Sequence, residues 1–189
     1  MSVSAPVKAS DRPKLLGLDR AGLEALFVSW GEPRFRASQV LQWLHARQVS
    51  DFAQMSNVSK ALRARLEESC ETGELEVLRE QLAADGTRKW LLGLTDGNAI
   101  ETVFIPEEER GTLCISSQVG CSLACSFCAT GAQGLSRNLE THEIIAQIRV
   151  ARHVLGLDAI SNVVFMGMGE PLLNLKQVLP AIRLLLDDY

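Results

Sequence analysis

Long apolar runs and strong net charge are both missing from this sequence of 189 residues. No stretch approaches the roughly 20 apolar residues that a membrane-spanning helix needs, and the first residues lack an apolar core of signal-peptide length. We therefore expect a cytoplasmic protein with no membrane contact. The formal net charge is only −4, so any contact with nucleic acid must be local rather than spread over the whole surface.

Cysteine is also scarce, with five residues in the chain. An odd count without an export signal argues against a disulfide scaffold and favours metal or redox chemistry in a reducing compartment. Cys70 stands apart, and we expect it to be a core or helix-end residue. The other four cysteines fall within one short segment: Cys114, Cys121, Cys125 and Cys128.

The first 74 residues divide into two stretches. Residues 1–14 have no periodicity, which predicts a flexible arm. Residues 15–74 have apolar positions at helical spacing, which predicts a small helical accessory domain. Asp19 can cap its first helix, and His45 is expected on the surface. Six basic residues lie outside the apolar faces: Arg34, Arg36, Arg47, Lys60, Arg63 and Arg65.

Residues 75–110 are expected to form a β meander and a charged connection. Three extended runs are separated by Asp85-Gly86 and Asp96-Gly97, which are strong signals for tight turns. The sequence therefore changes from helical to strand patterning near residue 75.

Residues 111–189 alternate between strand and helix patterns, which is typical of a parallel α/β layer. Helices are expected over about 141–155 and 175–187. The apolar run NVVFMGMG (162–169) predicts a fully buried strand. The fold class is thus α/β, and this segment contains too few βα units to close a barrel.

Cys121, Cys125 and Cys128 form a C-x3-C-x2-C pattern. Three thiolates on one tight loop can hold three corners of a [4Fe–4S] cluster and leave the fourth iron open. S-adenosylmethionine (SAM) can chelate such an open iron. The alternative is a structural zinc site, which needs four closed ligands. His142 is the nearest histidine, and we expect it to be exposed at a helix start.

A second candidate segment follows the predicted strand 162–169 and contains Gly169 and Glu170. Ligands of α/β sheets bind at the carboxyl ends of strands, where this segment lies. Glycine permits close backbone approach, and a carboxylate suits a positively charged group. Taken alone, these residues could simply be a turn. Met166 and Met168 are expected to be packing residues.

The segment GCSLACSFCATG, together with Gly-Glu-Pro at residues 169–171, resembles the signature of the radical SAM superfamily. The resemblance implies a partial (βα) barrel, a [4Fe–4S] cluster on the three cysteines and SAM as cofactor. It also implies that Phe127 lies against the adenine of SAM, and that Gly169 and Glu170 meet its amino group.

The flanking stretch ETVFIPEEERGTLCISSQVGC narrows the resemblance to bacterial dual-specificity methyltransferases that modify adenine C2 in 23S rRNA and tRNA. In that family, one SAM methylates a cysteine near the C-terminus. A second SAM yields a 5′-deoxyadenosyl radical that activates this methyl group for addition to adenine. The resemblance implies that Glu101 accepts the C2 proton and that Cys114 resolves the enzyme–RNA adduct. It further implies a flavodoxin-type electron donor and RNA contact by the helical domain.

The chain departs from this family in having no cysteine after Cys128 and too few βα units. We therefore expect a truncated chain that does not complete the reaction alone. Other interpretations stay open: Glu101 could be an outward strand residue, Cys114 a small buried one, and the basic residues a solvated face. The protein could also be a zinc-binding, non-catalytic RNA-binding module, or a radical SAM enzyme acting on another substrate.

Overall fold

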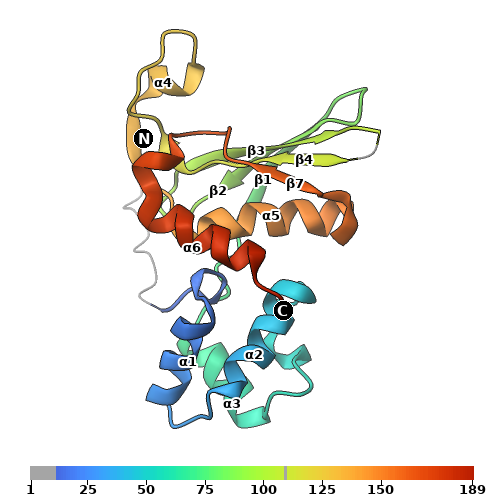
Figure 1. The fold of residues 1–189 in the computed structure, drawn as a ribbon, viewed down its shortest axis with the longest axis vertical. Helices are drawn as coiled ribbons and strands as arrows, with labels where there is room; N and C mark the ends of the chain where they lie inside the picture. The colour runs from blue at the N-terminus through green and yellow to red at the C-terminus, as the bar shows by residue number, and fades with distance from the viewer. Residues whose placement is uncertain (1–11, 109) are drawn as a thin grey trace, which may run out of the picture.

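The computed structural model describes residues 12–108 and 110–189, so most of the predicted flexible arm (1–14) lies outside the described residues. Figure 1 shows two parts, a group of short helices and a sheet backed by two long helices. Among the described residues, no helix has the length and apolar character needed to cross a bilayer.

The helical group forms because short apolar faces converge on one core. Asp19 accepts a hydrogen bond from the Gly22 N–H and Ser59 one from the Leu62 N–H, so side chains cap two of the helices. Leu23, Phe27 and Leu66 are fully buried between them. The elements are η1 (Leu15–Gly17), α1 (Arg20–Ser29), α2 (Phe35–Leu41), its continuation η2 (Gln42–Ala46), η3 (Phe52–Gln54) and α3 (Lys60–Ser69).

A five-stranded sheet follows, with strand order β1-β2-β3-β4-β7. The first three strands pair antiparallel, which confirms the predicted meander. The sheet continues without a break, since β4 pairs antiparallel with β3 and β7 pairs parallel with β4. Its strands are β1 (Glu76–Leu82), β2 (Arg88–Gly93), β3 (Ala99–Pro106), β4 (Gly111–Cys114) and β7 (Asn162–Val164).

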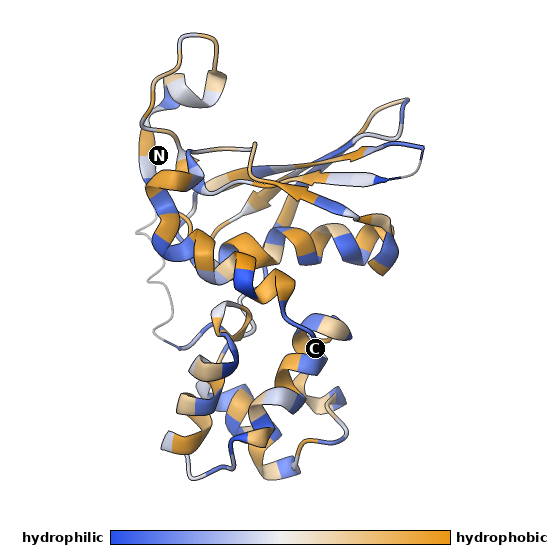
Figure 2. Ribbon diagram, in the orientation of Figure 1, coloured by the Kyte–Doolittle hydropathy of each residue, from blue (hydrophilic) through white to orange (hydrophobic). Residues whose placement is uncertain are grey.

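One face of this sheet is covered by α5 (Thr141–Leu155) and α6 (Leu175–Leu186) (Figure 1). Both helices lie where they were predicted. Figure 2 shows apolar residues along both helices and the strands above them. The buried side chains of the sheet alternate with half-exposed ones along β2 and β3, as one covered face requires. The core is therefore a two-layer α/β sandwich.

The prediction of a fully buried strand over 162–169 is wrong. Only residues 162–164 form a strand, β7, and they range from exposed to half-buried. A parallel strand is buried on both faces only where other elements cover both. Here β7 is the edge strand and helices cover one face only. Met168 packs in the core as expected, whereas Met166 is 80% exposed and is not a packing residue.

Arg149 joins the helical group to the sandwich. Its guanidinium, on α5, is buried and donates to the backbone carbonyls of Leu44 and Gln48. It also forms an ion pair with Glu74, at 2.7 Å. Because carbonyls and a carboxylate are satisfied by one buried cation, the two parts are held in a defined orientation.

We expect Arg149→Met to destabilise the fold by about 2–4 kcal/mol, because it leaves buried carbonyl groups without a donor. Urea denaturation measures the change. Arg183→Met on the exposed side of α6 is the control and should shift stability by no more than about 0.5 kcal/mol. Equal losses in the two variants would contradict the role given to Arg149.

Candidate functional site

The three clustered cysteines lie on a loop at the end of a separate hairpin. Strands β5 (Gln118–Gly120) and β6 (Leu135–Asn138) pair antiparallel, and the loop with α4 (Ala129–Gln133) connects them. In Figure 1 this loop and α4 project away from the body of the molecule. The sequence did not predict β6 or α4, since LSRN is too short and polar to give a strand pattern.

The loop turns tightly between its cysteines. Cys121 is buried and its N–H donates to the Gly134 carbonyl at 3.0 Å, which closes the base of the loop. The Cys128 N–H donates to the Cys125 carbonyl at 3.0 Å, and Ala124 adopts a positive φ of 47°. These bonds keep the three thiols on one short turn, with Cys125 and Cys128 half-buried.

The donor set fits an iron–sulfur cluster better than structural zinc. All three thiols are free, and soft sulfur ligands suit iron–sulfur clusters. Structural zinc needs a fourth ligand besides these thiols. Within residues 12–108 and 110–189, no three Cys, His, Asp or Glu side chains gather closely enough to hold a metal ion. The thiols therefore share a loop, but they do not converge on one point.

His142 does not supply that fourth ligand. The expectation that it is exposed is wrong, because it is only 9% exposed at the start of α5. Its Nδ1 lies 3.2 Å from the Glu140 carboxylate, and burial lowers the pKa of the imidazole. Gly73 packs against the imidazole ring, and Gly17 packs against the His142 backbone and Cβ.

The Gly-Glu segment lies against the base of the cysteine hairpin. The Met168 carbonyl accepts hydrogen bonds from the N–H groups of both Ser117 and Gln118, at 2.8 and 3.1 Å. Gly169 has φ +95°, and a Cβ there would come within 2.5 Å of the Gln118 side chain. Only glycine fits this position, so the close approach expected of it exists.

The Glu170 carboxylate is oriented by its own loop. Its Oε1 accepts a hydrogen bond from the Leu172 N–H at 3.1 Å, as the N-cap of η5 (Pro171–Asn174). The loop and the hairpin thus place Glu170 beside the segment that leads into Cys121. The predicted cofactor-binding and metal-binding residues come from one region of the molecule.

Glu101 and Cys114 share the face of the sheet opposite to α5. Thr102 donates a hydrogen bond to Gln147 of α5, so its neighbour Glu101 points away from that helix. Val103 pairs directly with Cys114, which puts this cysteine on the same face as Glu101. The Glu101 carboxylate is 44% exposed and forms an ion pair with Lys89 at 2.6 Å.

The Cys114 thiol is half-buried next to the Gly-Glu loop. Burial raises its pKa, although a hydrogen bond from the Met166 backbone acts in the opposite direction. The protonated thiol is therefore favoured at neutral pH. Cys70 is buried at the end of α3, as expected, and burial raises its pKa to about 11.

Ionic contacts fasten the hairpin to the body of the protein. Arg137 of β6 forms a bidentate ion pair with the Glu143 carboxylate of α5, at 2.7 and 2.8 Å. It also pairs with Asp96 in the β2–β3 turn, and this hydrogen bond lowers the pKa of Asp96 to about 2. The hairpin is therefore tied to two other elements despite its projecting loop.

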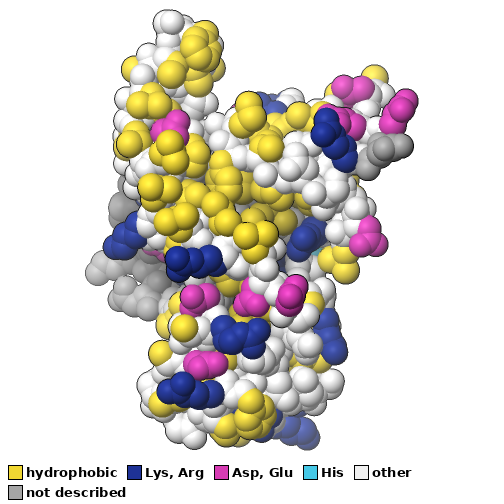
Figure 3. All heavy atoms as spheres, viewed as in Figure 1, with side chains coloured by type: hydrophobic (Ala, Val, Ile, Leu, Met, Phe, Trp, Pro, Cys, Tyr) yellow, Lys and Arg dark blue, Asp and Glu magenta, His cyan; other side chains and the backbone are white. Residues whose placement is uncertain are grey.

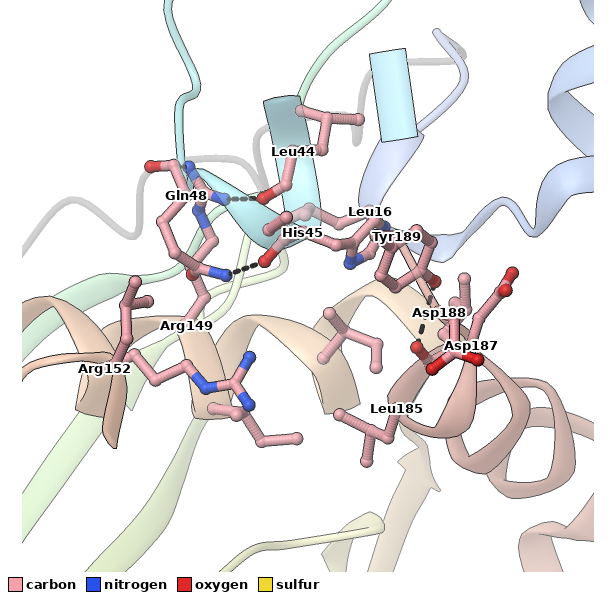
Figure 4. A pocket seen from close by; sticks show the side chains of 15 residues that line it. Leu16, Leu44, His45, Gln48, Arg149, Arg152, Leu185, Asp187, Asp188 and Tyr189 are labelled. Carbon is pink, nitrogen blue, oxygen red and sulfur yellow. Dashed lines mark hydrogen bonds between the residues drawn. The ribbon is translucent and has the colours of Figure 1, made fainter. Parts of the chain in front are cut away.

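A second concavity lies far from the cysteine loop, between the helical group and the ends of α5 and α6 (Figure 4). His45 lines it and stacks on Tyr189 with ring centroids 4.8 Å apart, so the prediction of a surface histidine is wrong. Burial, with Arg149 and Arg152 nearby, lowers the pKa of His45 to about 4. The cavity measures about 340 Å³ and contains none of the predicted site residues.

Sequence reasoning missed three buried polar residues at the site. Ser116, Gln118 and Gln147 are each no more than 1% exposed and connect the strands, the hairpin and α5. Ser116 and Gln118 lie in the stretch ISSQVG, which gives only a strand signal. Three of their partners, Gln147, Met168 and Glu170, lie 31 to 52 residues later, which no local pattern reveals.

Comparison with known proteins gives two family matches. The family described as ribosomal RNA large subunit methyltransferase N-terminal domain matches residues 13–72, and the radical SAM superfamily matches residues 115–188. A radical SAM methyltransferase from Sphaerobacter thermophilus has a similar structure, with a TM-score of 0.85 and 39% identity. The match covers 93% of this chain and 52% of that one.

Proteins named dual-specificity RNA methyltransferase RlmN are similar in sequence. The protein of Halorhodospira halophila is 58% identical over 93% of this chain, and that of Alkalilimnicola ehrlichii 60% identical over 92%. The protein of Marinobacter nauticus is 52% identical over 95%. The chain spans about half the length of each of these relatives.

We expect Gly169→Ala to destabilise the chain by roughly 2–4 kcal/mol, since it adds both positive-φ strain and overlap with Gln118. Gly31→Ala is the matched control, because Gly31 has φ +79° and nothing within 4 Å of an added Cβ. The control should lose only the strain, about 1–2 kcal/mol. Thermal unfolding of both variants tests this. Equal losses of stability would show that the close packing at Gly169 contributes nothing to the free energy of unfolding.

The raised pKa of Cys114 predicts slow alkylation by iodoacetamide near neutral pH. A raised pKa means a smaller thiolate fraction, and the thiolate is the nucleophile. The pH profile of Cys114 alkylation in the metal-free chain, followed by mass spectrometry, should have its midpoint above that of an unstructured peptide with the same sequence. A midpoint at or below the peptide value would contradict the burial argument.

Proposed function

We propose that this chain, which has the sequence and fold of the N-terminal half of RlmN-type radical SAM methyltransferases, forms the cluster-binding part of an enzyme that methylates adenine C2 in RNA. The observation that carries the proposal is that the Gly169–Glu170 segment lies against the base of the hairpin that carries the cysteine loop, where Ser117 and Gln118 donate hydrogen bonds to Met168. A zinc-binding RNA module gives no reason for a Gly-Glu segment to lie there.

In this proposal, Cys121, Cys125 and Cys128 hold a [4Fe–4S] cluster with one open iron. The bound cluster supplies the electron that cleaves SAM to a 5′-deoxyadenosyl radical. Glu170 and the backbone at Gly169 bind the amino end of SAM, because a carboxylate complements an ammonium group. Phe127 is 91% exposed on the cysteine loop, so its ring is free to lie against the adenine of SAM.

Glu101 and Cys114 act on the RNA side of the reaction. Glu101 accepts the proton that leaves adenine C2, and its pairing with Lys89 holds the carboxylate in place on the open face of the sheet. Cys114 resolves the covalent enzyme–RNA adduct. Both side chains lie on the face that α5 and α6 leave uncovered, which is where a substrate can approach.

Substrates of the proposed enzyme are 23S rRNA and tRNA, and a flavodoxin-type protein supplies electrons. No cysteine follows Cys128 in this sequence, so none of its residues is assigned the role of the methyl-carrying cysteine. Figure 3 shows hydrophobic side chains gathered over the middle of the molecule, where α6 and the edge of the sheet lie. Exposed apolar residues in and near these elements include Met166 after β7, Leu172 and Leu173 in η5, and Leu179 and Leu186 in α6.

RNA contact by the helical group is part of the proposal. Three of the six basic residues lie over aromatic rings, with Arg47 over Trp43 at 4.2 Å, Arg65 over Trp30 at 4.6 Å and Arg36 over Phe35 at 4.9 Å. Arg36, Arg63 and Arg65 also donate to carbonyls of their own domain, and Arg34 lies 3.6 Å from Glu24. Arg47, which is exposed, is therefore the better candidate for phosphate or base contact.

Anaerobic reconstitution with iron and sulfide tests the proposed cluster. The wild-type chain should bind roughly four iron and four sulfide and turn brown, whereas Cys125→Ala should lose most of both, because three thiolates are the protein ligands. Cys70→Ala is the control and should retain the cluster. One colourless zinc per chain with no iron uptake would favour the RNA-binding module instead.

A further inference from the structure

We propose that Gln118 is a positioning residue that fixes the SAM-binding segment to the hairpin that carries the cluster cysteines. This inference rests on the proposed function, because it assigns Gln118 a role in binding SAM. It adds a residue to which neither the signature motifs nor the sequence pattern gave any role.

The contacts of Gln118 join the two segments directly. Its side-chain Oε1 accepts a hydrogen bond from the Glu170 N–H at 2.9 Å. Its Nε2 donates to the Asn138 Oδ1 at 2.8 Å, on the second strand of the hairpin. Gln118 is 1% exposed, whereas Glu170 is half-buried and Asn138 exposed.

An amide is the group that this position requires. It donates in one direction and accepts in the other, whereas a lysine only donates and an ionised carboxylate only accepts. Burial of the Gln118 amide makes the loss of either bond costly, because the amide group itself then stays without a partner. Gly169 packs on the same side chain, since an added Cβ would approach the Gln118 Cγ to 2.7 Å.

Ser116 provides a second link two residues earlier. Its hydroxyl donates to the Glu101 carbonyl at 2.6 Å and accepts from the Met168 N–H at 2.9 Å. Gln147 of α5 braces Ser116 by bonds to its backbone N–H and carbonyl, at 2.7 and 2.9 Å. The Gly-Glu loop is therefore held on both sides by buried side chains from one strand segment.

SAM must reach two places at once, the open iron of the cluster and the Gly169–Glu170 segment. Its affinity then depends on the relative position of the cysteine hairpin and that segment, which Gln118 fixes. The three thiols do not depend on the Gln118 side chain for their chemistry. Loss of this side chain should therefore weaken SAM binding and leave cluster assembly intact.

The variant Gln118→Met tests this, because methionine has a similar length and no hydrogen-bonding amide. After anaerobic reconstitution, we expect iron and sulfide contents equal to wild type and a Kd for SAM raised roughly tenfold, as for the loss of one buried hydrogen bond. Equilibrium dialysis measures the Kd. In the metal-free chain, hydrogen–deuterium exchange at the Glu170 amide should become faster by roughly tenfold or more.

Gln177→Met is the matched control. Gln177 joins α6 to α5 through bonds to the Thr141 N–H and hydroxyl, and none of its bonds reaches the Gly169–Glu170 segment. It should change neither the SAM Kd nor exchange at Glu170. If Gln118→Met fails to fold, Asn138→Ala gives the same test from an exposed position, with an expected three- to fivefold rise in Kd.

Unchanged SAM affinity in Gln118→Met and in Asn138→Ala, with wild-type iron content, would overturn the inference and leave the proposed function standing. Loss of iron in Gln118→Met at wild-type stability would also overturn it, because the residue would then serve the cluster. A wild-type chain that takes up no iron defeats the proposed function itself. Faster exchange at Glu170 in Gln118→Met would still show the positioning effect in that case, so the two failures are distinguishable.

Discussion

Two backbone N–H groups that share one carbonyl hold this site together. Ser117 and Gln118 donate to Met168, and this places the end of the sheet next to the start of the cysteine hairpin. Side chains reinforce the contact from both sides, with Ser116 bonded to Met168 and Gln118 to Glu170. Because Ser116, Ser117, Gln118 and Met168 are buried, breaking one of these bonds leaves a buried polar group unsatisfied, and the arrangement is correspondingly rigid.

The same constraint explains the distribution of glycine at the site. A Cβ at Gly167 would lie 2.8 Å from the Ile115 carbonyl, and one at Gly169 2.5 Å from Gln118. Backbone thus packs on backbone where the loop crosses the end of β4. This close approach puts Glu170 within reach of the hairpin. The two glycines are therefore needed for close packing and not for flexibility.

The sandwich itself is asymmetric, and the asymmetry matters for function. Helices α5 and α6 cover one face of the sheet, while Glu101 and Cys114 lie on the other. Edge strand β7 has only one neighbour, and apolar side chains near it and along α6 are exposed. In relatives about twice as long, further chain is available to cover such a surface. In the proposed function, the substrate approaches Glu101 and Cys114 from this open face.

Much of the fold could be predicted from local sequence. The meander followed from Asp85-Gly86 and Asp96-Gly97, and α5 and α6 followed from helical periodicity, because turn chemistry and periodicity are properties of neighbouring residues. The prediction of a fully buried strand over 162–169 was wrong, since the burial of an apolar run depends on which other elements cover it. His45 and His142 were expected at the surface for the same kind of reason, and both are buried by segments distant in sequence.

The cysteine spacing by itself determined the candidate cluster ligands, because three thiols within eight residues must share one loop whatever the rest of the chain does. Tertiary structure alone decided that the base of the hairpin carrying this loop meets the Gly169–Glu170 segment, and that Glu101 and Cys114 share a face. Those relations depend on strand order, register and buried hydrogen bonds between segments 11 to 52 residues apart. Such long-range pairings leave no periodic trace in the sequence.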